Sequence, residues 1–458
     1  MKLRFLIFFL IVLSCSETVN PEYYENWKLR RKNALYAEDG FLNLAGLYQI
    51  EDGKHTMGSS EGNDMLMPNG FPDNFAEFTV KDSIITFKYY VRVCIANLNS
   101  IFIKNLFMDV VFINPNSSAK AYQDLALTYS AIEPPTWALL LAQACRSKNF
   151  KVSILDCDAE RLSLHDSLLR IEEVKPRLIC FVVYGQNPNS GTTSMIGATA
   201  LGAYIREHAP EYPICFVGSH TSAMPRDVLK YAFVDYVLLN EGVYALQNLL
   251  RTNLKDDLHK VKGIGRKNDG QLILNNPEQV VPQDRMDVDM PGYAWDLLPY
   301  KEKPLDLYRA HFWHAEFSHE KRTPFAAIYT SLGCRFACDF CMINIVNRNN
   351  NADDINASHS KGMRYWSPKF IIKEFEKLAE LGVETIRISD EMFFLNKKYF
   401  NPLIDGLIER DIGLRMWAYS RVDTVQEKFL DKFKKAGINW LALGIEAGNQ
   451  TVRQEVSK

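Results

Sequence analysis

Three cysteines in the second half of the chain have the spacing of a metal–sulfur site. Cys334, Cys338 and Cys341 follow the pattern C-x3-C-x2-C, directly after an apolar, strand-like run at residues 325–330. Three thiolates on one short loop can hold three irons of a [4Fe–4S] cube and leave the fourth iron open for a small molecule. A structural zinc knuckle is the alternative, but structural zinc takes four protein ligands and no fourth cysteine lies nearby.

This motif, with the aromatic Phe340 before its last cysteine, resembles that of the radical S-adenosylmethionine (SAM) enzymes. The resemblance implies that the three cysteines bind a [4Fe–4S] cluster whose open iron chelates the amino and carboxylate groups of SAM. It also implies that one electron from the cluster cleaves SAM to a 5′-deoxyadenosyl radical. An electron donor such as flavodoxin or ferredoxin is then an expected partner, and Phe340 is expected beside the cofactor.

The elements that must position this loop alternate between strand and helix, which predicts an α/β fold. After the strand at 325–330, apolar strand-like runs and helical runs follow at residues 367–381, 384–390, 397–409, 414–419, 425–436 and 440–445. This order resembles the first part of the partial TIM-type barrel of radical SAM enzymes, which has six strand–helix units. Because the chain supplies four units, we expect an unpaired sheet edge and an exposed apolar interior.

Charged residues at the C-terminal ends of such barrel strands are candidates for chemistry. The resemblance places Glu391 on the SAM amino group, where the family has a Gly-Gly-Glu-type motif, although both glycines are replaced here. It places Arg421 on the SAM carboxylate, which suits the fork of donors in a guanidinium group. Glu446 is expected at the SAM ribose hydroxyls. Each of the three residues has an alternative role in a surface ion pair.

A second α/β pattern precedes the first, over residues 108–255. Apolar runs that end in turn residues alternate with helical stretches, at residues 109–116, 151–156, 178–184, 214–218 and 236–242. This pattern predicts a doubly wound, Rossmann-like parallel sheet, which binds ligands at the carboxyl ends of its strands.

The order and the loops of this region resemble the cobalamin-binding domain that precedes many radical SAM modules, and a generic flavodoxin-like domain is the alternative. The D-x-H-x-x-G signature, which puts a histidine on cobalt, is absent, so we expect His220 near the nucleotide tail or the substrate. The loop residues that the resemblance and the strand ends assign to cobalamin are Asn116, Tyr184, Gly185, Gly218, Ser219, His220, Glu241 and Gly242.

The N-terminal region has a different character. Residues 1–15 have a basic start, a short apolar core and a small residue before Cys15, the form of a secretory signal that resembles a bacterial lipobox. Within residues 16–95, the stretch 58–64 resembles the G-S-x-x-x-N-D motif of a family of uncharacterised bacterial lipoproteins; plain turn chemistry is the alternative. We expect membrane attachment only if this signal is used. An oxygen-sensitive cluster belongs in the cytoplasm, and the enzyme-like pattern opens at Met108, so we expect the enzyme to begin there. A genuine fusion whose signal is not used is the alternative.

Composition sets the remaining limits. The chain of 458 residues is 47% hydrophobic and 24% charged with a net charge of −2, which is typical of a multidomain globular protein without a nucleic-acid-binding surface. The predicted organisation is a connector at 256–324 between the cobalamin-binding domain and a truncated radical SAM domain at 325–458. The predicted function is cobalamin-dependent methyl transfer to a carbon of a small-molecule substrate. A radical oxidative cyclase and a non-catalytic envelope lipoprotein are the alternatives.

Overall fold

The computed structural model describes most of the chain beyond Phe107 and part of what precedes it. The described residues are 53–58, 60, 62–66, 76–81, 84–89, 107–123, 125, 129–185, 190–298, 307–316, 321–338, 340–343, 348–349, 351–354 and 362–456. The chain divides into two compact units, Met1–Lys104 and Asn105–Lys458. In neither unit does a described helix have the length and apolar character needed to cross a membrane. The signal-like segment 1–15 lies outside the described residues.

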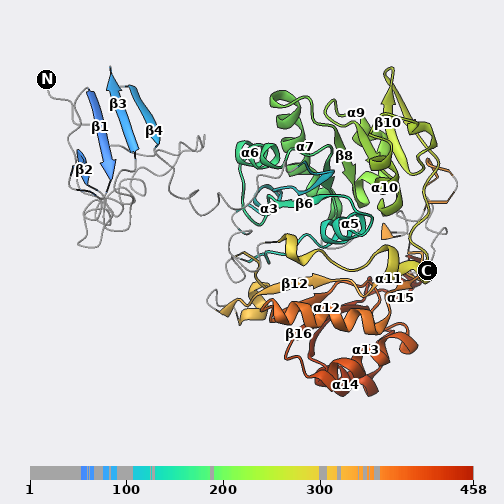
Figure 1. Cartoon of the computed structure of the whole chain (residues 1–458). Helices are drawn as coiled ribbons and strands as arrows, with labels where there is room; N and C mark the ends of the chain where they lie inside the picture. Colours follow the sequence, from blue (N-terminus) through green and yellow to red (C-terminus); the bar gives the residue numbers. More distant parts are fainter. Residues whose placement is uncertain are drawn as a thin grey trace. The chain divides into compact units, whose positions relative to one another are not determined.

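The first unit contains a small sheet with the strand order β2-β1-β3-β4 (Figure 1). Its strands are Gly53–Gly58 (β1), Met65–Leu66 (β2), Ala76–Lys81 (β3) and Ile84–Tyr89 (β4). The Asp64 carboxylate accepts hydrogen bonds from the Thr56 amide at 2.8 Å and the Thr56 hydroxyl at 3.0 Å. Asp64, part of the lipoprotein-like motif, therefore fixes the turn between β1 and β2.

The second unit begins with a seven-stranded sheet in the order β11-β10-β9-β8-β7-β5-β6. Its parallel strands are Val110–Asn114 (β5), Val152–Asp156 (β6), Ile179–Val182 (β7), Ile214–Val217 (β8) and Tyr236–Leu238 (β9). The order reverses beside β5, which is where a doubly wound sheet opens a ligand crevice. The predicted α/β class and Rossmann-like sheet are confirmed.

Helices cover both faces of this sheet because alternate residues of each strand enter different hydrophobic cores. One face packs against Leu164–Val174 (α6), Gly191–His208 (α7) and Pro225–Lys230 (α9), and the other against Thr136–Arg146 (α5) and Val243–Arg251 (α10). Two short helices, Ser118–Tyr122 (α3) and Ser219–Ala223 (α8), follow β5 and β8 at the carboxyl edge. Figure 1 shows these layers in blue-green to green.

The connector contributes two strands to the first sheet. Its hairpin, Ile264–Asn268 (β10) and Gln271–Leu274 (β11), pairs antiparallel with β9 and extends the sheet. Sequence analysis had assigned the sheet no such extension; the hairpin satisfies backbone groups that β9 would otherwise leave unpaired at its edge. A short helix, Met286–Asp289 (α11), and 3-10 turns at Leu258–Lys260, Gln283–Arg285, Trp295–Leu297 and Phe312–Ala315 complete the connector.

A four-stranded parallel sheet with the order β12-β15-β16-β17 forms the last part of the chain. Its strands are Phe325–Ile328 (β12), Thr385–Ile388 (β15), Arg415–Arg421 (β16) and Ile438–Gly444 (β17). A two-stranded ribbon, Ser331–Leu332 (β13) with Arg364–Tyr365 (β14), flanks the cysteine loop. β17 pairs only with β16 among the described strands, and Trp440 and Ile445 are each 53% exposed beside that edge.

The helices of this region are Pro368–Glu380 (α12), Lys397–Arg410 (α13) and Leu430–Lys435 (α14), which precede β15, β16 and β17, and Gln450–Val456 (α15), which follows β17; they are drawn in orange and red in Figure 1. Ser367 caps α12 by accepting from the Phe370 amide, and Pro368 stands at its first position, two residue types that favour a helix start. The core of this sheet is continuous with the core under α5 and α10. The two α/β regions therefore share one hydrophobic interior.

Candidate functional site

All residues that sequence analysis assigned to the cluster and to SAM line one cavity at the carboxyl end of the second sheet. These residues are Cys334, Cys338, Phe340, Cys341, Glu391, Arg421 and Glu446. They come from the cysteine loop and from the ends of β15, β16 and β17, because parallel strands bring their carboxyl ends to one edge.

The cysteine loop is held by backbone hydrogen bonds of its own. The Cys341 amide donates to the Cys338 carbonyl at 3.1 Å, and the Phe336 amide donates to Cys334 Sγ at 3.4 Å. Amide donation to sulfur is one of the means by which a protein tunes an iron–sulfur cluster. Burial raises the pKa of Cys334 to about 11 and that of Cys341 to about 12, so cationic iron is needed to hold these thiols as thiolates.

The donor set fits a cluster better than a single ion. Within the described residues, no three histidine, cysteine or acidic side chains converge closely enough to ligate one metal ion. Thiolates of a cube bind different irons and so need not converge on one point. The three cysteines instead surround a shared cavity, with sulfur as the donor atom that iron–sulfur clusters require.

Arg421 has one nitrogen ready for a ligand in this cavity. Its Nε and Nη2 atoms donate to the Asp423 carboxylate at 3.1 and 2.9 Å, and its guanidinium lies 4.1 Å from the centre of the Phe336 ring. Its Nη1 atom is buried and has no hydrogen-bond partner among the described residues. An unsatisfied buried donor is costly, and a ligand carboxylate in the cavity would satisfy it.

The two glutamates differ in their surroundings. Burial, with the Asp390 carboxylate as a smaller cause, raises the pKa of Glu391 to about 7. Glu446 is exposed, and its backbone has a φ of 66°, a left-handed conformation that non-glycine residues rarely adopt. Such strain is often kept at functional sites.

Side chains outside the cavity fix the path from β12 to the cysteine loop. The buried Asp390 carboxylate accepts from the Thr330 amide at 2.5 Å and from the hydroxyls of Thr330 and Ser331 at 2.6 Å. The Tyr399 hydroxyl donates to the Thr330 carbonyl at 2.7 Å. The Tyr293 hydroxyl bridges the amide and the carbonyl of Tyr329, each at 2.8 Å. The strand that leads into the cysteines is thereby tied to β15, to α13 and to the connector.

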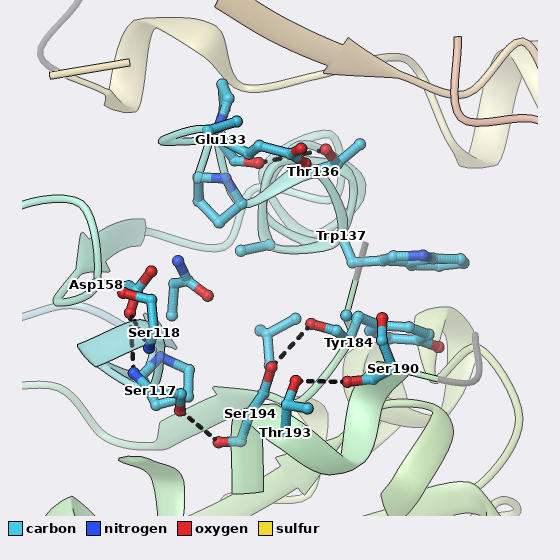
Figure 2. A pocket seen from close by; sticks show the side chains of 18 of the residues that line it. Ser117, Ser118, Glu133, Thr136, Trp137, Asp158, Tyr184, Ser190, Thr193 and Ser194 are labelled. Atoms are coloured by element: carbon cyan, nitrogen blue, oxygen red, sulfur yellow. Dashed lines mark hydrogen bonds between the residues drawn. The ribbon is translucent and has the colours of Figure 1, made fainter. Parts of the chain in front are cut away.

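A second cavity lies at the carboxyl edge of the Rossmann-like sheet (Figure 2). The ring of Trp137, at the start of α5, stacks on that of Tyr184, after β7, with centroids 4.3 Å apart and planes 10° apart. Opposite them, the Asp158 carboxylate accepts from the amides of Ser117 and Ser118 at 2.9 and 2.8 Å. Tyr184 and Gly185, both predicted cobalamin residues, line this cavity.

A third cavity has Tyr184, Ser219, Glu241, Arg364 and Glu391 in its walls. We call it the joining cavity because it shares lining residues with each of the other two. It shares aromatic residues with the Rossmann cavity and shares Ile343 and Glu391 with the cluster cavity. Three buried atoms of its lining, the Tyr184 hydroxyl, the Ser219 hydroxyl and Arg364 Nε, have no partner among the described residues. A chain of cavities with unsatisfied polar atoms therefore runs from one α/β region to the other, which fits a large bound cofactor and a substrate.

The other predicted cobalamin residues do not line these cavities. Asn116 donates to the Leu162 carbonyl at 3.2 Å, and His220 Nδ1 lies 2.9 Å from the Thr192 hydroxyl. Gly218, with φ 145°, and Gly242, with φ 77°, have the backbone freedom that their turns require, and a Cβ on Gly218 would lie 2.1 Å from the Val183 carbonyl oxygen. These residues shape the loops around the crevice.

Two buried carboxylate–arginine pairs join the α/β regions. Glu241 pairs with Arg364, at 2.9 Å between Oε2 and Nη2, and also accepts from the Val281 amide. In the second pair, Glu133 before α5 meets Arg387 of β15 at 2.9 and 2.6 Å. Sequence analysis predicted neither pair. A charged residue inside the apolar run of β15 was the available signal, because a buried charge needs a partner.

The comparisons with protein families identify both regions. Residues 122–250 match the B12 binding domain, and residues 328–458 match the radical SAM superfamily. The chain therefore carries a B12-binding domain followed by a radical SAM domain, the domain pair of the cobalamin-dependent radical SAM enzymes. The predicted resemblance is confirmed.

Individual relatives are distant. An uncharacterized methyltransferase of Pyrococcus horikoshii is 24% identical over 71% of this chain and 63% of its own length. An anaerobic magnesium-protoporphyrin IX monomethyl ester cyclase of Rubrivivax gelatinosus is 24% identical over 77% of this chain and 58% of its own. The chain thus spans about six tenths of the length of these relatives.

Solved structures share the fold. The radical SAM methyltransferase TsrM of Kitasatospora setae, with cobalamin and a [4Fe–4S] cluster bound, has a TM-score of 0.54 and 18% identity over 76% of this chain and 63% of that chain. OxsB, a cobalamin-dependent SAM radical enzyme with aqua-cobalamin and SAM bound, has a TM-score of 0.54 and 15% identity over 94% of this chain and 57% of that chain.

Proposed function

We propose that this protein is a cobalamin-dependent radical SAM enzyme that transfers a methyl group to a carbon of a small-molecule substrate. The observation that carries the proposal is the series of three cavities. One is lined by the three cysteines, one by the carboxyl edge of the B12-binding domain, and one joins them. When bound, the cluster and SAM supply the radical, and cobalamin supplies the methyl carrier.

The residues of this chain have separate tasks in that proposal. The three cysteines hold the cluster, while Glu391 orients the SAM amino group and Arg421 binds the SAM carboxylate through its unsatisfied Nη1. Asp390 fixes the entry to the cysteine loop through its three hydrogen bonds. The buried lining of the joining cavity excludes water, which protects a reactive radical from side reactions.

The substrate group is best placed in the joining cavity, between the cofactors. Two hydroxyls and one guanidinium Nε–H are unsatisfied there, while Glu241 already neutralises Arg364. These features favour an uncharged group that accepts hydrogen bonds over an anion, because an anion would meet the carboxyl groups of Glu241 and Glu391.

A ring-forming oxidative reaction is the second candidate. The specific observation in its favour is the cyclase of Rubrivivax gelatinosus among the relatives, at the same identity as the methyltransferase. The two reactions differ in their products, because methyl transfer yields S-adenosylhomocysteine in addition to 5′-deoxyadenosine, whereas cyclisation does not require it.

The test is anaerobic reconstitution of the full chain with iron, sulfide and hydroxocobalamin, followed by reduction in the presence of SAM. We expect absorption bands of a cluster and of bound cobalamin, and release of 5′-deoxyadenosine. A triple Cys→Ala variant of the loop is the control and should release none. Failure of the wild-type chain to bind cobalamin, or 5′-deoxyadenosine release equal to that of the control, would refute the proposal.

A further inference from the structure

The short helix α8 links the third cavity to a residue that follows the cysteine loop. Its first residue, Ser219, lines that cavity and stands between Gly218 and His220 of the predicted cobalamin loop. Its C-terminal end, at Ser222 and Ala223, meets a residue of the other domain. The helix is a single rigid turn, with the Ser222 amide donating to the Gly218 carbonyl at 2.8 Å. A ligand that fixes one end of α8 therefore also fixes the other.

The residue that meets α8 is Arg348, which follows Cys341 on the segment leaving the cluster loop. Arg348 is only 4% exposed. Its Nη1 atom donates to the Ser222 carbonyl and, at 3.0 Å, to the Ser222 hydroxyl, and its Nη2 donates to the Ala223 carbonyl at 3.4 Å. A guanidinium fork thus closes the C-terminal end of the helix.

The backbone of Arg348 is held from the same side. Its amide donates to Asn240 Oδ1 at 3.0 Å, and Asn240 Nδ2 donates back to the Arg348 carbonyl at 3.1 Å. The Asn240 amide in turn donates to the Ser222 hydroxyl at 2.9 Å. Asn240 has a φ of 57° and stands next to the buried Glu241. Arg348, Asn240 and Ser222 therefore form one buried hydrogen-bond network across the domain boundary, in which Arg348 Nε has no partner among the described residues.

A buried network of this kind has few alternative arrangements. Every partner that is lost leaves a buried donor or acceptor unsatisfied, so Arg348 and helix α8 are held in one relative position or released together. An exposed contact between the same two regions differs in this respect. Arg226 and Asp353, 46% and 57% exposed, pair at 2.8 Å but can exchange each other for water.

We propose that Arg348 is a positioning residue that couples cobalamin binding beside Ser219, whose buried hydroxyl has no partner among the described residues, to cluster binding at the cysteine loop. This inference rests on the proposed function. It adds that binding of one cofactor changes the affinity of the protein for the other. Such coupling is reciprocal by thermodynamic necessity: the factor by which the cluster tightens cobalamin is the factor by which cobalamin tightens the cluster.

The experiment is an absorbance titration of the full chain with hydroxocobalamin, once with the cluster reconstituted and once without it. We expect the Kd for hydroxocobalamin to be lower in the cluster-loaded protein by about five-fold or more, the lower end of usual coupling factors. We also expect the electron paramagnetic resonance spectrum of the reduced cluster to change when cobalamin is added.

Two variants remove the coupling by different routes. Arg348→Lys keeps the charge but loses the fork, and Asn240→Gly keeps the left-handed backbone but removes the side-chain bonds to Arg348. In both, the ratio of the two Kd values should fall toward one, and the cluster spectrum should no longer respond to cobalamin. Arg226→Ala is the matched control, because it breaks the exposed contact between the same regions and should keep the wild-type ratio.

The outcomes separate the inference from the proposed function. If the wild-type chain binds cobalamin with the same Kd in both states, the coupling is wrong while the proposed function stands. If it binds no cobalamin in either state, the proposed function fails first. The inference is also overturned if both variants keep the wild-type ratio, or if Arg226→Ala lowers the ratio as much as they do.

Discussion

The buried pair between Glu133 and Arg387 gives the sharpest test of how the two domains are held together. The side chain of Arg387 is 3% exposed and that of Glu133 is 12% exposed, and two short contacts join them. Replacing Arg387 by Met removes the cation and leaves a mostly buried carboxylate without its partner. Breaking a buried pair from one side costs about 3–5 kcal/mol of unfolding free energy.

The unfolding free energy of the Arg387 variant should depend on pH in a way that the unfolding free energy of the Glu133 variant does not. Burial raises the pKa of Glu133, and in Arg387→Met nothing opposes that effect. A carboxyl group with a raised folded-state pKa contributes stability that is lost as pH rises, so the variant should be least stable near pH 8 and partly recover near pH 5.5. His311 Nε2 lies 3.7 Å from Glu133, but burial lowers the pKa of His311 to about 3, so this imidazole stays neutral between pH 5.5 and pH 8.

The reciprocal variant, Glu133→Gln, should behave differently. It leaves a buried guanidinium that cannot lose its proton at any of these pH values, so acid gives no relief. The assay is urea unfolding of each variant at pH 5.5 and pH 8, followed by tryptophan fluorescence. Arg415→Met is the control, because Arg415 and Glu384 pair at 3.2 Å on the same sheet while 53% and 58% exposed, and it should cost less than about 1 kcal/mol.

Two results would refute this reasoning. One is a cost for Arg387→Met that is no larger than that for Arg415→Met. The other is an equal loss of stability at both pH values, since a buried carboxylate that has lost its cation must respond to protonation.

Three further predictions follow from individual sites. Each cysteine of the loop changed to Ala should lower the iron bound per chain after reconstitution, whereas Cys145→Ala in the core should not; unchanged iron in all three loop variants would contradict the cluster assignment. The Co(II) form should show no histidine nitrogen splitting in electron paramagnetic resonance, and splitting that disappears in His220→Ala would show the opposite. Burial raises the pKa of Asp156 to about 7 from 3.8, so this group should lower stability by up to roughly 4 kcal/mol between pH 4 and pH 8. Asp156→Asn should flatten urea-unfolding stability against pH, and parallel curves for the two proteins would rule this out.

The fold was predictable because its signals are local. The alternation of apolar strands with helices identifies both parallel sheets, and the start of α12 at Ser367 and Pro368 can be recognised from neighbouring residues alone. The pairing of the hairpin at 264–274 with β9 could not be recognised in this way. A turn signal fixes how two strands pair with each other, and carries no information about the edge against which they pack.

Some residues of the candidate site could likewise be predicted from the sequence, and others could not. The residues assigned to the cluster and SAM gather in one cavity because the strand ends that carry them must meet at one edge of a parallel sheet. The residues that tie the domains together could not be found in this way. Arg387 and Arg348 meet partners 254 and 126 residues away, and no periodicity reports such a distance.

The contacts that sequence analysis missed are also those that decide whether two cofactors can act together. A cluster loop and a Rossmann-like crevice can each form within its own domain, but a group passed between them needs a fixed separation. Glu133, Glu241 and Asn240 each stand beside the crevice and reach an arginine of the radical SAM domain. Because these contacts are buried, changing one should disturb the relation between the sites before it disturbs either site alone. If the two domains were joined only by the chain, changing one of these contacts would leave the relation between the sites as it was. In a preorganised enzyme, the relation between the sites is lost first.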